Sequence, residues 1–230
     1  MHKQTRFVAL CSALVLGAAA IAAAQQIASP GVHPISGRRY ALTMSYLGAD
    51  WLDRSERVQE EEPDAALDAI ALAPGSVAAD VGAGSGYMTV KMAKRVGPTG
   101  KVYANDIQPQ MLTILRQRLD KEKVANVELV LGTMDDPKLP ANTLDLILMV
   151  DVYHEFAQPQ PMLRKMRDSL KTGARLVLLE YRKEDPSIPI RPDHKMSVAE
   201  AKMEVEAEGF TLAKVDERLP RQHILVFTKN

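Results

Sequence analysis

The sequence predicts an α/β protein with a mostly parallel sheet that is covered by helices on both faces. From residue 76 onward, short apolar runs alternate with stretches whose apolar residues recur three or four positions apart. These are the patterns of buried strands and amphipathic helices, and their alternation indicates right-handed βαβ units. A glycine-rich turn follows the first run, and the last two runs are joined by a short turn around Pro220. That final pair predicts an antiparallel hairpin.

The elements are expected in the following order. The five parallel strands are the aliphatic runs 77–81, 102–104, 127–131, 144–150 and 176–179, and the hairpin strands are 211–215 and 223–228. Apolar residues at helical spacing mark the helices between them, at 88, 92 and 96, at 111, 115 and 119, and at 162, 166 and 170. Helix stops are expected at 97–100 (Gly-Pro-Thr-Gly) and 171–173 (Lys-Thr-Gly), and a last helix near 198–208.

The N-terminal end has the three-part pattern of a secretory signal. A basic start precedes the apolar run 7–23, and small residues precede Gln25, which predicts a signal peptide over 1–24 with cleavage after Ala24. The expected location is therefore periplasmic or secreted. The alternative is a membrane anchor formed by an uncleaved 7–23, although this run is short and rich in alanine.

Residues 25–62 are expected to form an N-terminal extension with the character of a helical cap, and residues 63–230 the main domain. The stretch 51–71 has a helical pattern, and Pro63 is expected to open a second segment at its first turn. The acids at 60–62 are interpreted as the solvated start of that segment, because adjacent helical side chains do not converge on a metal.

The composition argues against several classes of function. Basic and acidic residues balance at 29 each, so there is no electrostatic case for a nucleic-acid partner. The single cysteine, Cys11, lies within the expected signal. We therefore expect no disulfide, no thiolate zinc site and no cysteine nucleophile in the processed chain.

The most informative segment is 79–87, Ala-Asp-Val-Gly-Ala-Gly-Ser-Gly-Tyr. A strand, a glycine turn and a helix start in succession bring bare backbone N–H groups to an anionic ligand. The dinucleotide fingerprint G-x-G-x-x-G would require glycine where this chain has Tyr87. The spacing therefore points away from NAD and toward a ligand that carries a carboxylate and an amine.

Polar residues follow the other strands, where ligands of parallel sheets bind. Asp106 closes the second strand and is expected to accept the two hydroxyls of a ribose, with a helix N-cap for 109–119 as the alternative. Thr133, Met134 and Asp135 follow the third strand. They would border an adenine, or Asp135 would form a turn instead.

Together these motifs resemble those of class I S-adenosylmethionine-dependent methyltransferases over about residues 60–230. The resemblance rests on Asp80-x-Gly82-x-Gly84-x-Gly86, Asp106, the polar loop after the third strand, Asp145-Leu-Ile-Leu-Met and the hairpin. It implies a Rossmann-like, seven-stranded, mostly parallel sheet with one antiparallel strand. The chain is most similar to bacterial methyltransferase-domain proteins that carry a secretion signal and the segment Gly48-Ala49-Asp50-Trp51-Leu52, a subgroup without a defined substrate.

The resemblance implies S-adenosyl-L-methionine as the cofactor. Asp80 would act through water or through the ammonium of the cofactor, and Val150 would present its carbonyl to that ammonium. The full set of implied cofactor-binding residues is Asp80, Gly82, Ala83, Gly84, Gly86, Asp106, Ile107, Met134, Asp135 and Val150.

Tyr153, His154 and Glu155 follow the fourth strand and are the predicted catalytic residues. A base at this position would reach the methyl group, and His154 titrates near neutral pH. The alternative for His154 is a hydrogen-bonded residue of the pocket wall, and Glu155 would either orient it or cap the next helix. His194 and Lys195 are interpreted as solvated residues of the irregular stretch 183–196.

No metal site is predicted. Asp151, Glu180 and His154 could be combined into one, as in catechol-type methyltransferases. Those enzymes require a carboxylate–carboxamide pair after the fifth strand, whereas Tyr181 follows Glu180 in this chain.

The predicted function is methyl transfer to an oxygen, nitrogen or carbon nucleophile of a small molecule. The alternative is an exported Rossmann-like module that binds S-adenosylmethionine or a nucleoside without a reaction. The expected partner is a small-molecule substrate, with no nucleic acid and no membrane span after signal cleavage. The sequence does not determine the oligomeric state.

Overall fold

The computed structural model describes residues 31–230, so the expected signal peptide lies outside the described residues. Its centre is a seven-stranded sheet in the order β3-β2-β1-β4-β5-β7-β6. Strands β1 to β5 pair in parallel, whereas β7 runs antiparallel to both β5 and β6. This arrangement confirms the predicted fold class, including the single antiparallel strand.

The strands are β1 (Val77–Val81), β2 (Lys101–Asp106), β3 (Val127–Leu131), β4 (Leu144–Val150), β5 (Leu170–Tyr181), β6 (Phe210–Asp216) and β7 (Gln222–Lys229). The α-helices are α1 (Ala49–Leu52), α2 (Arg57–Glu61), α3 (Pro63–Ala69), α4 (Tyr87–Val96), α5 (Pro109–Glu122), α6 (Pro159–Ser169) and α7 (Val198–Glu206). Short 3-10 turns are η2 (Tyr46–Gly48), η3 (Tyr153–Glu155) and η4 (Pro192–His194).

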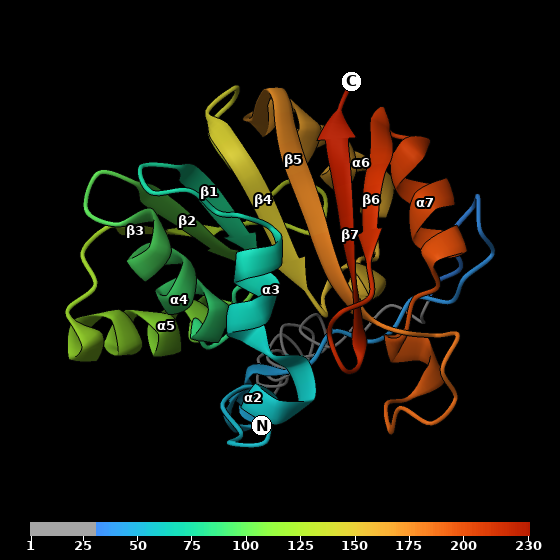
Figure 1. The fold of residues 1–230 in the computed structure, drawn as a ribbon, viewed down its shortest axis with the longest axis horizontal. Coiled ribbons are helices and arrows are strands. Elements are labelled where there is room, and N and C mark those ends of the chain that lie inside the picture. The colour runs from blue at the N-terminus through green and yellow to red at the C-terminus, as the bar shows by residue number, and fades with distance from the viewer. Residues whose placement is uncertain (1–30) are drawn as a thin grey trace, which may run out of the picture.

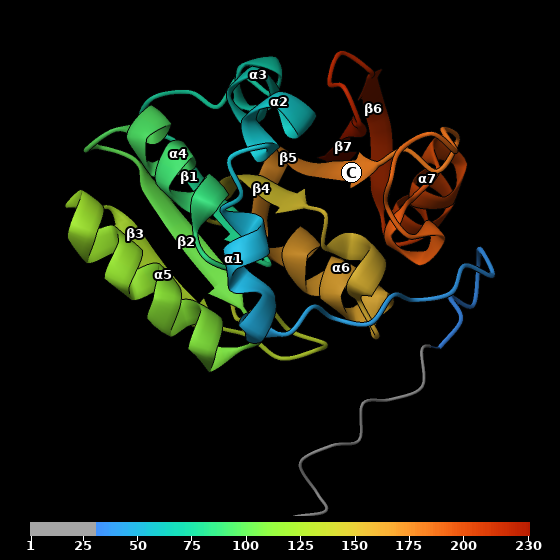
Figure 2. The same cartoon turned by 90° about the horizontal axis from the view of Figure 1, so that it is seen from below.

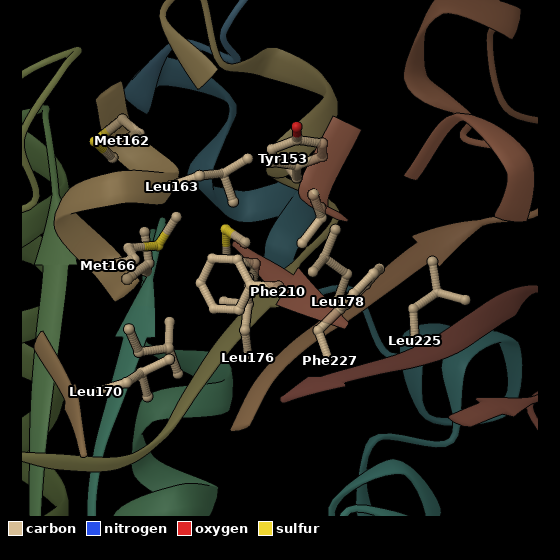
Figure 3. Packing of buried hydrophobic residues seen from close by; sticks show 14 of the residues in the cluster. Tyr153, Met162, Leu163, Met166, Leu170, Leu176, Leu178, Phe210, Leu225 and Phe227 are labelled. Atoms are coloured by element: carbon tan, nitrogen blue, oxygen red, sulfur yellow. The ribbon is translucent and has the colours of Figure 1, made fainter. Parts of the chain in front are cut away.

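Helices cover both faces of the sheet (Figure 1). On one face, α3 and α4 pack against β1, β4 and β5 through buried residues such as Leu67 and Met92. On the other face, α6 and α7 bury Met162, Met166 and Val205 against the opposite sides of the same strands. Figure 3 shows part of this second core, where side chains of α6 meet residues of β5, β6 and β7.

Some element boundaries differ from those expected. Leu170 begins β5 instead of ending a helix, because it pairs with Leu144 of β4. Residues 171–173 therefore lie within the strand and are not a helix stop. The expected helical stretch 51–71 is divided into α1, α2 and α3, and Pro63 occupies the first turn of α3 as predicted.

An N-terminal segment, residues 31–57, runs across the carboxyl ends of the strands. Figure 2 shows it passing α6 and reaching α1, which lies over the end of the sheet. Arg38 attaches this segment to Glu204 of α7 through an ion pair with two hydrogen bonds. Nε of Arg38 lies 3.0 Å from Oε1 of Glu204, and Nη2 lies 2.9 Å from Oε2. The N–H of Ala41 donates to the carbonyl of His154 at 3.0 Å. This segment therefore covers the end of the sheet at which the carboxyl ends of the parallel strands lie.

Within residues 31–230, every helix is too short or too polar to cross a membrane.

Candidate active site

The first cavity lies at the carboxyl ends of β1, β2 and β4 and is open to solvent; its space, including that open part, is about 800 Å³. Its walls come from strand ends and from the N-terminal segment. The lining includes Gly82, Gly84, Asp106, Ile107, Gln108, Thr133, Met134, Val150, Asp151, Glu155, Met44 and Leu52. The structure thus brings together most of the residues that the sequence assigns to the cofactor.

The glycine loop has a backbone that side chains would disrupt. Gly82 and Gly84 have φ values of 74° and 53°, in the left-handed region that glycine tolerates best. A Cβ on Gly82 would lie 2.4 Å from Val152, and one on Gly84 would lie 2.7 Å from Leu52. Glycine is therefore required here both by the backbone angles and by the closeness of the neighbouring side chains.

The N–H groups of this loop are not bare, contrary to expectation. Those of Gly82 and Ala83 both donate to the carbonyl of Asn105 at 2.9 Å. The N–H of Gly84 donates to Oδ2 of Asp106 at 3.0 Å. Buried N–H groups need an acceptor, and the adjacent end of β2 provides it. These three N–H groups are therefore already hydrogen-bonded within the protein. The loop lines the cavity, but these groups are not free donors for a ligand.

Asp106 is held by backbone on both carboxylate oxygens. Oδ1 accepts the N–H of Gln108 at 2.8 Å, and Oδ2 accepts that of Gly84. Burial raises the pKa of Asp106, and these hydrogen bonds oppose the rise. Because Gln108 itself is the N-cap of α5, Asp106 forms a turn just before the helix, and it is also one of the residues that line the cavity.

Asp80 lies beneath the glycine loop and not in the main cavity. It borders a small adjoining pocket with Ala83, Arg57 and Tyr87. Its Oδ2 accepts the hydroxyl of Thr89 at 2.6 Å. Burial raises the pKa of Asp80 to about 6, against the lowering effect of that hydrogen bond. In this structure the Asp80 side chain links the end of β1 to Thr89 of α4.

The loop after β3 supplies the far end of the cavity. Thr133 and Met134 line it, whereas Asp135 is exposed and accepts the Thr133 hydroxyl at 2.6 Å. The turn that was the alternative for Asp135 is therefore present. Gly86 also lies outside the cavity lining, where it starts α4 at a φ of 84°.

Asp151 is a strained residue that borders both this cavity and the next. It has a φ of 52°, a conformation that costs energy in a residue other than glycine. Its Oδ2 accepts a hydrogen bond from the side chain of Gln222 at 2.7 Å, but Oδ1 is buried and has no hydrogen-bond partner among residues 31–230. Burial, together with the negative charges of Glu61 and Glu180, raises its pKa. Oδ1 is thus an unsatisfied oxygen of a residue that borders both cavities.

The second cavity adjoins the first and is also open to solvent; its space, including that open part, is about 900 Å³. The two share Met44, Leu52, Val150, Asp151 and Glu155 in their linings. Side chains from distant parts of the chain complete it: Trp51, Arg57, His154, Tyr181, Pro189, Ile190, Arg191 and His194.

His154 borders the second cavity, and both of its ring nitrogens have neighbours. Nδ1 lies 2.6 Å from Oε2 of Glu180, and Nε2 lies 3.1 Å from Nδ1 of His194. Burial lowers the pKa of His154, but the Glu180 carboxylate outweighs it and the net shift is upward. For His194 the net shift is downward, because burial and the nearby His154 both disfavour its charge.

Glu155 borders both cavities. Its carboxylate accepts the N–H of Met44, at 3.2 and 3.3 Å to its two oxygens. Burial raises the pKa of Glu155 to about 7, partly offset by His154. Tyr153, in contrast, lies in the core beside Met162 and Leu163 (Figure 3) and borders neither cavity.

Two interpretations of charged residues require correction. Glu61 is not solvated: it is buried and accepts hydrogen bonds from Arg54 and Arg57 at 2.6 Å each and from the Tyr181 hydroxyl at 2.8 Å. Its spacing of four from Arg57 is a sequence signal for this pair. Lys195 is also buried, and its ammonium donates to two backbone carbonyls of the 183–196 stretch.

Gln108 is a site residue that sequence reasoning missed. Its side chain donates to the carbonyl of Met44 at 3.0 Å and accepts the N–H of Tyr46 at 2.9 Å. It thereby ties the N-terminal segment to the end of β2. No local pattern distinguishes this glutamine, because its partners lie more than sixty residues away in the sequence.

The first cavity has the features that S-adenosylmethionine requires. The glycine loop and Asp106 both line this cavity, and the absence of side chains on Gly82 and Gly84 leaves space for a bound chain. The unpartnered Oδ1 of Asp151 offers an acceptor to an ammonium group. These residues therefore fit the cofactor that the sequence implies.

Comparisons with known proteins agree with this description. Residues 72–219 match the family model described as a methyltransferase domain. A stretch of 111 residues is 36% identical to the ubiquinone/menaquinone biosynthesis C-methyltransferase UbiE of Ectopseudomonas mendocina, covering 48% of this chain and 43% of that protein. The Escherichia fergusonii protein of the same name is 34% identical over 118 residues, covering 51% and 47%. The chain thus spans about half the length of these curated relatives.

Solved structures show the same fold. A SAM-dependent methyltransferase from Aquifex aeolicus superimposes with a TM-score of 0.76 and 27% identity, covering 81% of this chain and 98% of that chain. The [4+2]-cyclase SpnF has a TM-score of 0.62 at 14% identity, covering 85% and 89%. At that identity the second likeness concerns the fold alone.

Proposed function

We propose that this chain methylates a small molecule. The premise is its family: the chain belongs to the methyltransferase-domain family of class I S-adenosylmethionine-dependent proteins. The first cavity would hold the methyl donor and the second the acceptor. One observation carries the proposal: the two cavities adjoin through Val150, Asp151 and Glu155. Methyl transfer is an in-line displacement, so its main requirement is that two reactants be held in line at a shared wall.

The residues of the first cavity are assigned to the donor. Asp106 would accept the ribose hydroxyls, and Thr133 and Met134 would border the adenine. Oδ1 of Asp151 would accept the ammonium of the methionine part, a role that the sequence-based assignment gave to Asp80 and the Val150 carbonyl. When bound, the donor supplies an activated methyl group. The protein positions it and keeps water away.

The residues of the second cavity are assigned to the acceptor. Trp51, Tyr181 and Ile190 provide apolar surface, and His154 and Glu155 provide polar atoms beside the shared wall. This combination favours a flat, largely apolar molecule with one polar group. The names of the UbiE proteins describe C-methylation in ubiquinone and menaquinone biosynthesis, so quinone precursors are the first acceptors to test. A binding module without chemistry would need only the first cavity.

Binding measurements on the full-length chain test this proposal. We expect S-adenosylmethionine to bind in calorimetry and S-adenosylhomocysteine to raise the melting temperature. His154→Ala should keep that melting shift, because His154 borders only the acceptor cavity. No binding of either compound to the wild-type chain would contradict the proposal, and loss of the shift in His154→Ala would contradict the division of roles.

We also propose that the leader 1–24 directs export, with an anchor formed by 7–23 as the alternative. The support is the sequence pattern alone. A fusion to an alkaline-phosphatase reporter separates the compartments, because that reporter is active only after export. Fractionation of the fusion then distinguishes a soluble exported chain from one that stays with the membrane.

A further inference from the structure

Three side chains that can ligate a metal meet at one side of the second cavity. Nε2 of His154 lies 3.1 Å from Nδ1 of His194, which in turn lies 3.9 Å from Oε1 of Glu155. One ligand atom from each residue lies within 4.8 Å of the others. His154 and Glu155 belong to η3 and His194 to η4, so the fold brings the third residue in from a separate loop.

We infer that His154, Glu155 and His194 bind a first-row divalent transition-metal ion. Two nitrogen ligands, each about 2.0–2.1 Å from zinc in a tetrahedral site, lie roughly 3.3 Å apart, which is close to the 3.1 Å between Nε2 of His154 and Nδ1 of His194. Two imidazoles and one carboxylate suit such ions and leave coordination positions open. Magnesium and calcium prefer sites made of oxygen ligands alone.

Glu155 needs only a small movement to complete the site. Its two oxygens share the N–H of Met44 at 3.2 and 3.3 Å, which are long hydrogen bonds. One oxygen can therefore keep this N–H while the other turns to an ion. The carboxylate is already within 4.0 Å of the His194 ring.

Glu180 is the positioning residue of this site. Its Oε2 lies 2.6 Å from Nδ1 of His154, and its Oε1 accepts the N–H of Tyr153 at 2.9 Å. A carboxylate that accepts a hydrogen bond from Nδ1–H fixes the tautomer in which Nε2 carries the lone pair that binds a metal, as in the carboxylate–histidine–metal arrangement. Glu180 is fully buried and acts through His154.

His223 is a buried histidine whose two ring nitrogens are both engaged by side chains of the protein. Both of its ring nitrogens face carboxylates, with Nδ1 2.6 Å from Glu217 and Nε2 3.0 Å from Glu184. No ring nitrogen of His223 is left for an ion, although the residue is as buried as His154. It therefore serves as a matched control.

The role of the ion, unlike its binding, rests on the proposed function. An ion beside the wall shared by the two cavities would face the acceptor. It would lower the pKa of a hydroxyl bound to it. The acceptors favoured by this site are therefore small molecules that carry a hydroxyl group.

The test is metal binding by the full-length chain, purified without a histidine tag and stripped with a chelator. We expect Zn²⁺ to bind with one ion per chain in calorimetry, and Co²⁺ to give a visible absorption band that reports its ligands. His194→Gln should weaken binding at least tenfold and abolish that band. Glu180→Gln should weaken binding by about 10–100-fold and shift the band, which a merely structural role would not do. His223→Gln should bind as the wild type does.

Two outcomes overturn the inference: a wild-type chain that binds no stoichiometric ion, or equal losses in His194→Gln and His223→Gln. The S-adenosylhomocysteine melting shift, measured on each protein, confirms folding and tests the function separately. A chain with the shift but without zinc binding refutes the metal site and leaves the proposed function. A chain that binds zinc but shows no shift does the reverse.

Discussion

The two cavities of this protein are built in different ways. The first is made of strand ends and backbone: the glycine loop after β1, Asp106 after β2 and the turn after β3. The second is made of side chains that come from α1, α2, η3 and the 183–196 stretch. The first cavity therefore depends mainly on how the strands end, and the second depends mainly on side chains from separate segments of the chain. Substitutions should therefore affect the first and the second cavity separately.

Gly84→Leu should abolish donor binding. Its φ of 53° disfavours any side chain, and a Cβ would meet Leu52 at 2.7 Å. We also expect the free energy of unfolding to fall by about 1–3 kcal/mol through overpacking. Calorimetry with S-adenosylhomocysteine and denaturant melts measure the two effects. Gly173→Leu is the control, because it has a φ of 73° but open space around it. Equal loss of binding in both variants would show that closeness to Leu52 is irrelevant.

Glu61→Ala should damage the acceptor side and the fold. It leaves Arg54, Arg57 and the Tyr181 hydroxyl without their buried partner. Removing one member of a buried ion pair costs about 3–5 kcal/mol of unfolding free energy, measurable by urea titration. The affinity for S-adenosylhomocysteine should change less than threefold at temperatures where the variant is folded. A larger change would mean that the two cavities are not separable.

Asp106→Ala should weaken donor binding by about 3 kcal/mol, roughly 100-fold, because the ribose acceptor and the partner of the Gly84 N–H are both lost. Calorimetry measures the change. Asp135→Ala is the matched comparison: its carboxylate is exposed and engaged in a turn with Thr133. A loss for Asp135→Ala as large as that for Asp106→Ala would move the adenine contact to Asp135.

Asp80→Asn should stabilise the ligand-free chain in a pH-dependent way. Burial raises the pKa of Asp80 from 3.8 to about 6, so the stability that its protonated form provides is complete below pH 4 and is lost as the pH rises through 6. The amide avoids that loss. The gain should therefore be near zero at pH 4 and reach about 2–3 kcal/mol above pH 7. Urea titrations at several pH values measure it, and a gain independent of pH would contradict this origin.

The sequence contains enough to predict the elements that form the first cavity, because their signals are local. The segment 79–87 indicates a strand, a turn and the start of a helix within nine residues. The apolar runs predict the positions of the strands. The predicted boundaries of elements were wrong where strand pairing determines them. Leu170 is an example, because it begins β5 by pairing with Leu144 of β4.

The acceptor side could not be predicted in the same way, because its contacts join residues far apart in the chain. His194 meets His154 across forty positions, and Tyr181 meets Glu61 across 120. Each residue alone resembles an ordinary loop or surface residue. Tyr153 illustrates the opposite difficulty: it follows the strand as a catalytic residue would, yet η3 turns it into the core.

The hydrogen bonds of the glycine loop have a consequence for the thermodynamics of binding. The Asn105 carbonyl and the Asp106 carboxylate fix the loop through hydrogen bonds within the protein itself. The donor then meets a surface that is preorganised, and little chain entropy is lost when it binds. Its affinity should accordingly owe little to coupled folding, and the heat-capacity change should reflect only the surface that the ligand itself covers.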